Sequence, residues 1–269
     1  MAITAADVKK LRDMTGAGMM DAKKALTEAE GDFDKAIEIL RVTGAAKAAK
    51  RDDRDAANGL VAACGKAMIK LAAETDFVAK NAEFIELAEK IVAAMDENQV
   101  ADLEGAKEMK LGDITVAETV HEMAVRIGEK LELAEAVRFE GNTEVYLHRR
   151  SQDLPPQVGV LVEYEGDKEE FAHDVALQIA SMSPEYVTRD EVPENILENE
   201  RRIAEETARE EGKPDHIIPR IVEGRLNGFF KNVVLLEQQS LVDDKKNVGQ
   251  LAKAAGVEIK RFARFSAGA

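Results

Sequence analysis

The sequence has 269 residues, a formal net charge of −15 at pH 7, 33% charged residues and 45% hydrophobic residues. The length suffices for two or three modest domains, and the acidic balance argues against direct nucleic-acid binding, which needs clustered Lys and Arg. The single cysteine, Cys64, excludes an intrachain disulfide and fits a reducing compartment. Because no signal peptide and no run of 18 apolar residues are visible, we predict a cytoplasmic protein without membrane contact.

Residues 1–43 are predicted to form a small module of three short helices, similar to a ubiquitin-associated (UBA-like) domain. Thr4 and Asp7 have the spacing of a capping box at the start of the first helix. Asp32 follows a glycine and is expected to cap the third helix, which Gly44 then ends.

The turn between the first and second helices has the sequence Gly-Ala-Gly at residues 16–18. It does not match a dinucleotide-binding loop, because a helix precedes it and the third spaced glycine is missing. Met19 and Met20 follow this turn, and so small a core cannot hold both, so at least one is expected at the surface. Whether the methionines contact a partner or serve only the core is left open by the sequence.

Residues 44–58 are predicted to be a linker, helical in part at its start, because they are small or charged and lack an apolar stripe. The lysines and arginines of this segment are largely offset by Asp52, Asp53 and Asp55. We therefore interpret the segment as a solvated linker rather than a nucleic-acid patch, and we place a domain boundary there.

Residues 59–141 are predicted to form an α+β subdomain with a small antiparallel sheet. Its expected elements are a strand at 60–63, a turn near Gly65, a strand at 67–73, a helix from about Asn81 to Met95, a helix opened by a capping box at Thr115 and Glu118, and a strand at 131–139.

A second subdomain, formed by residues 142–191 and 235–269, is predicted to repeat this plan. Its expected elements are strands at 145–148 and 158–164, a helix at 171–182 and a last strand at 257–265. The helix pattern around Phe171 echoes the pattern around Phe84. We therefore infer an internal duplication.

The two copies differ in the connection between the second strand and the helix. The interval from Glu74 to Phe84 is ten residues, whereas the interval from Glu165 to Phe171 is six, so about four extra residues fall within 75–80. A connection longer than the scaffold requires is better explained by a partner than by packing. The alternative is an ordinary start of a helix at which Phe77 packs on the nearest core.

Residues 192–234 are predicted to form a helical hairpin inserted into the second subdomain and projecting from it. The first arm is very polar, and its helical spacing produces one narrow stripe, made of Val192, Ile196, Ile203 and Thr207. The sequence leaves open whether the hairpin packs only on itself, binds a second copy of the chain or contacts another factor.

The sequence contains no strong candidate for catalysis or for cofactor or metal binding. None of the four histidines, His121, His148, His173 and His216, has metal-ligand spacing to another histidine or to a cysteine pair. No nucleophile elbow or phosphate-binding loop occurs. We therefore predict a binding protein without catalytic residues, cofactor or metal, rather than an enzyme.

Four blocks, at residues 11–26, 74–81, 222–226 and 235–238, occur in the order in which one family has them. Together they resemble bacterial translation elongation factor Ts, over almost the whole chain. The resemblance implies a guanine-nucleotide exchange factor for elongation factor Tu, a GTPase. Many members carry a further helical module after the last strand, whereas this sequence ends at Ala269, so no contact of such a module is assigned here.

The resemblance also implies site residues. In the family, the Asp-Phe pair of the second signature enters the nucleotide domain of elongation factor Tu and disturbs its magnesium site and phosphate loop, so that GDP leaves. Carried over by motif, this wedge comprises Thr75, Asp76, Phe77 and Val78. The N-terminal module touches the same domain of the partner, and the second subdomain touches another, which implies contacts by Arg12, Met19, Met20 and His148.

Two other classes of function remain as alternatives. An adaptor protein would use only residues 1–43 to hold a protein partner, which leaves the Asp76-Phe77 pair unexplained. A metal-assisted hydrolase would use histidines and aspartates that converge only in three dimensions.

Overall fold

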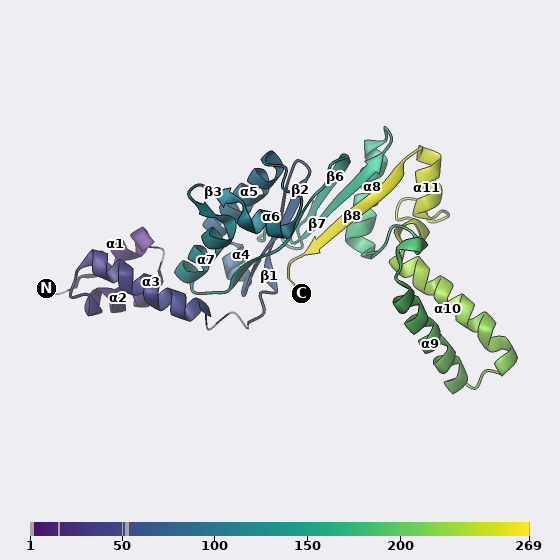
Figure 1. Cartoon of the computed structure of the whole chain (residues 1–269), viewed down its shortest axis with the longest axis horizontal. Helices are drawn as coiled ribbons and strands as arrows, with labels where there is room; N and C mark the ends of the chain where they lie inside the picture. Colours follow the sequence, from purple (N-terminus) through teal and green to yellow (C-terminus); the bar gives the residue numbers. More distant parts are fainter. Residues whose placement is uncertain (1–2, 16, 50, 52–53, 269) are drawn as a thin grey trace. The chain divides into compact units, whose positions relative to one another are not determined.

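The computed structural model describes residues 3–15, 17–49, 51 and 54–268 (Figure 1), and shows an α+β fold. The chain divides into two compact units. The first unit comprises Met1–Arg138, Arg149–Val158 and Phe265–Ala269, and the second comprises Phe139–His148 and Gly159–Arg264.

The N-terminal part of the first unit consists of α1 (Ala5–Thr15), α2 (Met19–Glu28) and α3 (Phe33–Ala49). The capping box is present, because the Asp7 amide donates to Thr4 Oγ1 at 3.2 Å and the Thr4 amide donates to Asp7 Oδ2 at 3.0 Å. The Asp32 carboxylate accepts hydrogen bonds from two amides of the first turn of α3, as expected. The small core contains Val8, Leu11, Ala22, Ala25, Leu26, Ala29 and Ala36.

The prediction that Gly44 ends the third helix is wrong, because α3 continues to Ala49. The alanines that follow Gly44 are the strongest helix formers. The glycine serves packing instead. A Cβ at Gly44 would lie 2.5 Å from Val125 Cγ1 and 3.0 Å from the Val125 carbonyl oxygen. Only a residue without a side chain therefore lets α3 approach Val125 so closely.

The rest of the first unit is built on a three-stranded antiparallel sheet in the order β1-β2-β5. Its elements are β1 (Asn58–Cys64), β2 (Ala67–Ala73), α4 (Asp76–Ala79), α5 (Ala82–Glu97), α6 (Leu103–Glu108), β3 (Lys110–Leu111), β4 (Ile114–Thr115), α7 (Val116–Ile127) and β5 (Leu131–Arg138). The expected hairpin, caps and final strand are confirmed, whereas the sequence pattern did not predict α6 or the two-stranded sheet β3-β4.

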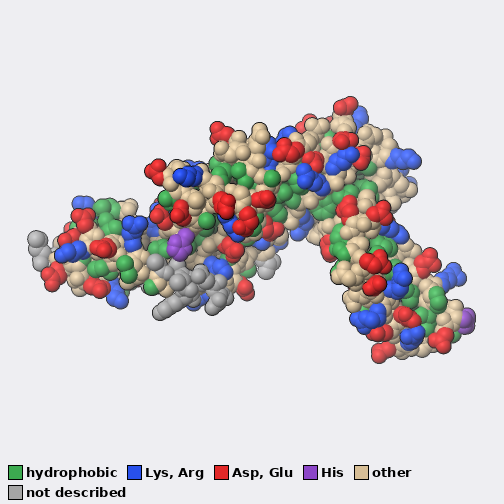
Figure 2. Space-filling model, in the orientation of Figure 1, with side chains coloured by type: hydrophobic (Ala, Val, Ile, Leu, Met, Phe, Trp, Pro, Cys, Tyr) green, Lys and Arg blue, Asp and Glu red, His purple; other side chains and the backbone are tan. Residues whose placement is uncertain are grey.

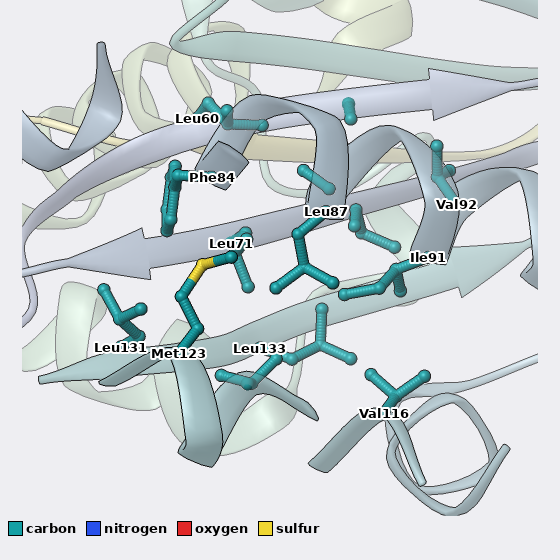
Figure 3. Packing of buried hydrophobic residues seen from close by; sticks show 14 of the residues in the cluster. Leu60, Leu71, Phe84, Leu87, Ile91, Val92, Val116, Met123, Leu131 and Leu133 are labelled. Atoms are coloured by element: carbon teal, nitrogen blue, oxygen red, sulfur yellow. The ribbon is translucent and has the colours of Figure 1, made fainter. Parts of the chain in front are cut away.

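The core of this unit lies between the sheet and the two long helices α5 and α7 (Figure 3). Phe84, Leu87 and Ile91 of α5 point toward the strands, where Leu71 and Leu133 receive them. Phe84, Leu71 and Ile91 are fully buried. Burying a side chain of this size stabilises the fold by roughly 1.5–3 kcal/mol, so this cluster fixes the end of β2 and the start of α5.

The second unit repeats the plan with a sheet in the order β6-β7-β8. Its elements are β6 (Asn142–His148), β7 (Val158–Glu165), α8 (Glu169–Met182), η1 (Arg189–Glu191), α9 (Glu194–Glu210), η2 (Asp215–Ile217), α10 (Ile218–Val233), η3 (Leu235–Glu237), α11 (Val248–Ala255) and β8 (Glu258–Ser266). In both units a strand pair is followed by a helix, and the last strand joins the sheet beside the second strand. The short helix α11 was not predicted.

Helices α9 and α10 form the predicted hairpin, which projects from the rest of the second unit in Figure 1. Its own small cluster contains Ala204, Ala208, Ile218 and Val222. The prediction of the packing stripe is wrong for Ile196 and Ile203, which are 36% and 42% exposed. The small alanines allow close approach to α10, and Arg225 Nη1 donates to the Ala204 carbonyl oxygen at 3.3 Å. Acidic and basic side chains are interspersed over the hairpin surface in view (Figure 2).

Candidate functional site

The connection between β2 and α5 occupies residues 74–81, eight residues, whereas only residues 166–168 separate β7 from α8 in the second unit. The extra residues were expected to form a loop. Instead, Asp76–Ala79 form the single helical turn α4. One residue, Lys80, separates the turn from Asn81, whose side chain accepts a hydrogen bond from the Glu83 amide and caps α5. The 74–81 connection is therefore an ordered part of the scaffold.

Within α4, neighbouring side chains face opposite environments. Val78 is 6% exposed and Ala79 is 1% exposed, and Val78 belongs to the core cluster of the first unit. Phe77 is 79% exposed. The turn is thus anchored by Val78 and Ala79 while it presents the Phe77 ring to solvent. Because this ring stays in water, the fold forgoes roughly 1.5–3 kcal/mol of stabilisation that its burial would contribute.

Asp76 lies beside Phe77 in the first turn of α4, and its carboxylate is half-exposed. Lys80 Nζ lies 3.4 Å from Asp76 Oδ2, one helical turn away. Ion pairs as exposed as this one contribute little, typically about 0–1 kcal/mol. The carboxylate therefore remains accessible to a partner.

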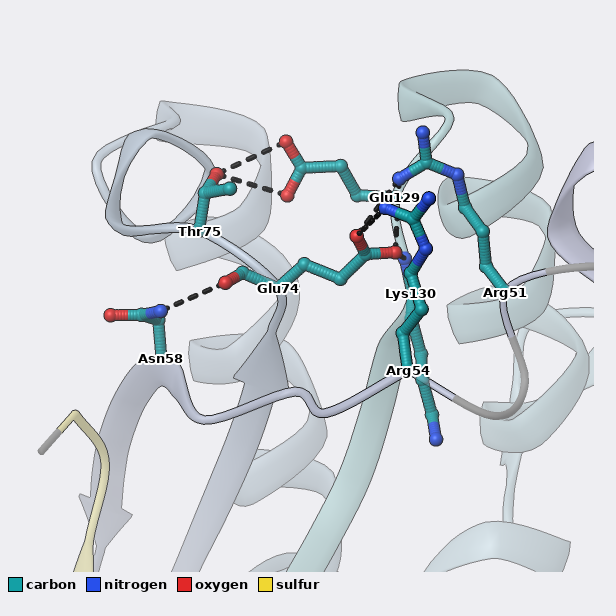
Figure 4. A network of polar contacts seen from close by, with 7 residues as sticks. All are labelled: Arg51, Arg54, Asn58, Glu74, Thr75, Glu129 and Lys130. Atoms are coloured by element: carbon teal, nitrogen blue, oxygen red, sulfur yellow. Dashed lines mark hydrogen bonds and ion pairs between the residues drawn. The ribbon is translucent and has the colours of Figure 1, made fainter.

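Glu74, the first residue of the 74–81 connection, is held by three donors (Figure 4). Arg51 Nη1 lies 2.9 Å from Oε2 and 3.0 Å from Oε1, and Arg54 Nη1 lies 3.1 Å from Oε2. The Lys130 amide donates to Oε1 at 2.7 Å. The Glu74 side chain is only 9% exposed. We call Glu74, Arg51, Arg54 and the Lys130 amide the Glu74 network.

The backbone and side chain next to Glu74 are fixed as well. Asn58 Nδ2 donates to the Glu74 carbonyl oxygen at 2.8 Å. Thr75 Oγ1 donates to Glu129 Oε1 and Oε2 at 3.0 and 2.9 Å (Figure 4). Thr75 is the N-cap residue of α4, but its hydroxyl makes no capping bond because it is turned to Glu129. The two residues that precede α4 are therefore both tied to other segments.

The Glu74 network sets the charge state of this carboxylate. Burial alone would raise the pKa of Glu74, but the hydrogen bond from the Lys130 amide and those from Arg51 and Arg54 outweigh burial. The pKa of Glu74 consequently lies below its ordinary value, and the group is ionised at neutral pH.

The predicted docking residues of the N-terminal helices are exposed. Met19 is 48% exposed and Met20 is 77% exposed, so the expectation that at least one lies at the surface is confirmed. Arg12 is exposed near the end of α1. Met14 and Val42 add further exposed apolar side chains to these helices, at 57% and 65%. Gly16 lies outside the described residues.

His148 belongs to the second unit, where it is the exposed last residue of β6. Its Nδ1 lies 3.1 Å from the Tyr146 hydroxyl oxygen. The His173 ring packs edge-on against Tyr146, and His173 Nδ1 lies 2.7 Å from Glu144 Oε1. The structure thus places His148 in a polar aromatic cluster of the second unit.

Comparisons with known proteins agree over the length of the chain. A family model described as "Elongation factor TS" matches residues 74–269. An elongation factor Ts of Cutibacterium acnes is 63% identical over 269 residues, which cover 100% of both chains. Proteins of the same name from Mycolicibacterium gilvum and Mycobacterium tuberculosis are 59% and 58% identical over 265 residues, which cover 98% of each chain.

The chain belongs to the elongation factor Ts family. Membership places it among the factors of translation elongation in protein biosynthesis. The matched region of the family model begins at Glu74, the first residue of the 74–81 connection, and the relatives cover the N-terminal helices as well.

The sequence pattern missed the contribution of the segment between α3 and β1. It was interpreted as solvated, yet Arg51 is half-buried and, together with Arg54, pairs with Glu74. Asp52 and Asp53, which were expected to offset these arginines, lie outside the described residues. The signal available in the sequence was Glu74 itself, a carboxylate placed directly after a fully apolar strand end, where a buried charge needs a partner.

Two further observations concern classes of site. Within the described ranges, no three His, Cys, Asp or Glu side chains are grouped so that they could hold a metal ion. Among the helices that the structure describes, none combines the length and the apolar character needed to cross a membrane.

Proposed function

We propose that the protein is a guanine-nucleotide exchange factor for elongation factor Tu, and that it acts in the cytoplasm by inserting α4 beside the nucleotide of its partner. One observation carries the proposal: Phe77 is 79% exposed on a helical turn that Val78 and Ala79 anchor in the core. A ring held outside the fold by a rigid support is suited to enter a cavity of another protein. Membership of the elongation factor Ts family supports elongation factor Tu as that protein.

The wedge residues have different roles in this proposal. Phe77 enters the nucleotide domain of the partner, and Asp76 brings a carboxylate next to its magnesium ion and phosphates. A carboxylate repels phosphate and offers Mg²⁺ an oxygen ligand of the kind it prefers. Thr75 and Val78 hold the turn, through Glu129 and through the core respectively.

No chemical step is needed for this activity. The factor must only bind nucleotide-free elongation factor Tu more tightly than the nucleotide-bound form. By linkage, bound GDP then lowers the affinity of elongation factor Tu for the factor by the same ratio by which the factor lowers its affinity for GDP. Each tenfold of this coupling corresponds to about 1.4 kcal/mol. Burial of one exposed phenylalanine ring in the partner accounts for one to two such factors, at roughly 1.5–3 kcal/mol.

Contacts outside the wedge are proposed to supply affinity. The exposed Met19 and Met20 offer adaptable apolar contacts, and Arg12 offers a charged contact from the neighbouring helix. His148 is proposed to contact a different domain of elongation factor Tu from the second unit. An adaptor that used the N-terminal helices alone would leave the exposed Phe77 without a role.

The test is the release of fluorescent GDP from elongation factor Tu, followed by stopped flow with the Phe77→Ala variant. We expect release to slow by about tenfold or more, which corresponds to about 1.4 kcal/mol, because the wedge has lost its ring. Asp76→Ala should slow it by a smaller factor. Leu241→Ala is the matched control, since Leu241 is 57% exposed on the second unit and plays no part in the proposal. Release at the wild-type rate with Phe77→Ala would contradict the wedge.

A further inference from the structure

We propose that Glu74 is a positioning residue for the wedge, and that Arg51 and Arg54 hold it so that α4 presents Phe77 in one fixed orientation. This inference rests on the proposed exchange function. It assigns a role in exchange to the segment between α3 and β1, which contacts the 74–81 connection through Arg51 and Arg54 (Figure 4).

The Glu74 carboxylate is a buried charge. Glu74 is 9% exposed, yet it is ionised and accepts bonds from Arg51, Arg54 and the Lys130 amide. A buried ion pair is weak evidence of stability, because desolvation of the charges offsets much of their attraction. Removal of one partner, in contrast, leaves a buried charge without compensation. The network therefore favours a single arrangement of the chain more than it strengthens the fold.

The Glu74 network holds the residue that lies directly before the wedge along the chain. Glu74 lies three residues before Phe77, and its carbonyl oxygen accepts from Asn58 while its carboxylate accepts from the arginines. Thr75 is tied to Glu129. Polar contacts thus fix both residues that precede α4, Glu74 and Thr75. The Phe77 ring, in contrast, is exposed and does not pack in the core. The direction in which the ring points is therefore set by the residues that precede α4 together with the core contacts of Val78 and Ala79.

The Glu74 network also involves the segment that follows the N-terminal helices. Arg51 stands two positions after the last residue of α3, and Arg54 stands four positions before the start of β1. The segment that joins the helices to the sheet is therefore fastened to the start of the wedge. Together with the close packing of α3 on Val125, this attachment holds the helices that carry Met19 and Met20 to the part of the first unit that carries Phe77. A partner that binds the methionines therefore meets Phe77 at a high effective concentration.

The experiment compares four variants of the full-length protein: Arg51→Ala with Arg54→Ala, the conservative Arg51→Lys, Phe77→Ala, and the triple variant that combines all three alanines. Two quantities are measured for each: the rate of GDP release at saturating factor, and the affinity for nucleotide-free elongation factor Tu. Arg202→Ala is the matched control, because it breaks an ion pair with Glu206 at 3.1 Å on the hairpin.

We expect the double arginine variant to slow GDP release at saturation by about fivefold or more, with a much smaller loss of affinity. Arg51→Lys keeps Arg54 and a cation at position 51, so it should lose less of the rate than the double variant. Added to Phe77→Ala, the arginine changes should have little further effect on release, since both act through the same ring. A wild-type rate in the double variant, or losses that simply add to that of Phe77→Ala, would overturn the inference.

Hydrogen exchange of free protein provides a readout that does not depend on exchange activity. Amides of residues 75–79 should exchange faster in the double arginine variant than in wild type, while those of β2 stay unchanged. Unchanged exchange in residues 75–79 would overturn the inference by itself, and so would faster exchange across the whole sheet, which indicates a general loss of stability. If GDP leaves elongation factor Tu at the wild-type rate with Phe77→Ala, the proposed function fails. This result differs from both hydrogen-exchange results that would overturn the inference.

Discussion

Phe77 and Val78 are adjacent in α4, yet one side chain is in solvent and the other is in the core. The sequence motif assigned both to the wedge, because a motif does not say which way a side chain points. The structure separates a contacting residue from an anchoring residue. Val78 is therefore expected to matter for the stability of the free protein, and Phe77 for contact with a partner. The two effects can be measured independently.

At the residue scale, we predict that Val78→Ala destabilises the free protein and that Phe77→Ala does not. Removal of methyl groups from a buried valine should lower the free energy of unfolding by about 1–3 kcal/mol. Loss of an exposed ring should change it by less than about 0.5 kcal/mol. Urea unfolding of the two variants measures both values. Equal destabilisation would mean that Phe77 is part of the core of the free protein.

At the element scale, local signals predicted most boundaries and tertiary contacts explain the errors. The caps at Asp32 and Thr115 were readable because the capping side chain and its amide are three residues apart or fewer. The role of Gly44 was predicted wrongly because the glycine is needed for close packing on Val125, which lies about eighty residues away in the sequence. The alternation of the strands predicted both sheets, whereas the Glu74 network joins segments 23 and 56 residues apart and leaves no periodic pattern.

Two glycines inside helices provide a matched test of this explanation. Gly44→Ala should lower the thermal midpoint, because its Cβ would lie 2.5 Å from Val125 Cγ1 and force α3 away from its neighbour. Gly224→Ala in α10 has no atom within 4 Å of the added Cβ, and should raise stability by about 0.4–1 kcal/mol. Differential scanning calorimetry distinguishes the two directions. A rise in both variants would show that Gly44 is not needed for close packing.

At the scale of the whole molecule, the hairpin is predicted to be dispensable for folding and for GDP release. Arg225 donates a hydrogen bond to the Ala204 carbonyl oxygen, so these two residues lie opposite each other on the two arms. Residues 205–224 can therefore be replaced by a short Gly/Ser turn. The cluster that is lost belongs to the hairpin itself. We expect the thermal midpoint to fall by less than about 10 °C, and GDP release to stay near wild type.

Light scattering of the shortened protein answers the question that the sequence left open. A lower mass than that expected from the deletion alone would show that the arms mediate self-association. A larger fall of the thermal midpoint would place the distal arms in the core of the second unit.

The response of the whole fold to acid follows from its carboxylates. Hydrogen bonds and cations lower the pKa values of several, namely Asp7, Glu74, Glu86, Glu118, Glu163 and Asp243. A lowered pKa in the folded state means that the unfolded chain binds more protons. The stabilisation is therefore present above about pH 4.5 and is lost as the pH falls through the folded values.

We accordingly predict that the thermal midpoint falls steadily below about pH 4.5. Glu163→Gln should flatten this fall, because the Arg261 guanidinium and the amides of Gly141 and Glu140 no longer face a titrating group. Calorimetry between neutral pH and about pH 3 measures the slope. A midpoint that rises on acidification would show that charge repulsion governs the fold instead.

The exposure of Phe77 has an optical consequence. The chain contains no tryptophan, and none of its three tyrosines lies in α4. Excitation at the red edge of protein absorption, where only tryptophan absorbs, therefore produces no fluorescence from the wild-type protein. A Phe77→Trp variant would carry the sole indole of the chain at the tip of α4, with a red-shifted, quencher-accessible emission in the free state. Entry of that ring into any dry cavity would shift the emission to the blue and shield it from iodide. The fold thus provides, at a single position, a reporter of whether the ring is in water or in a partner.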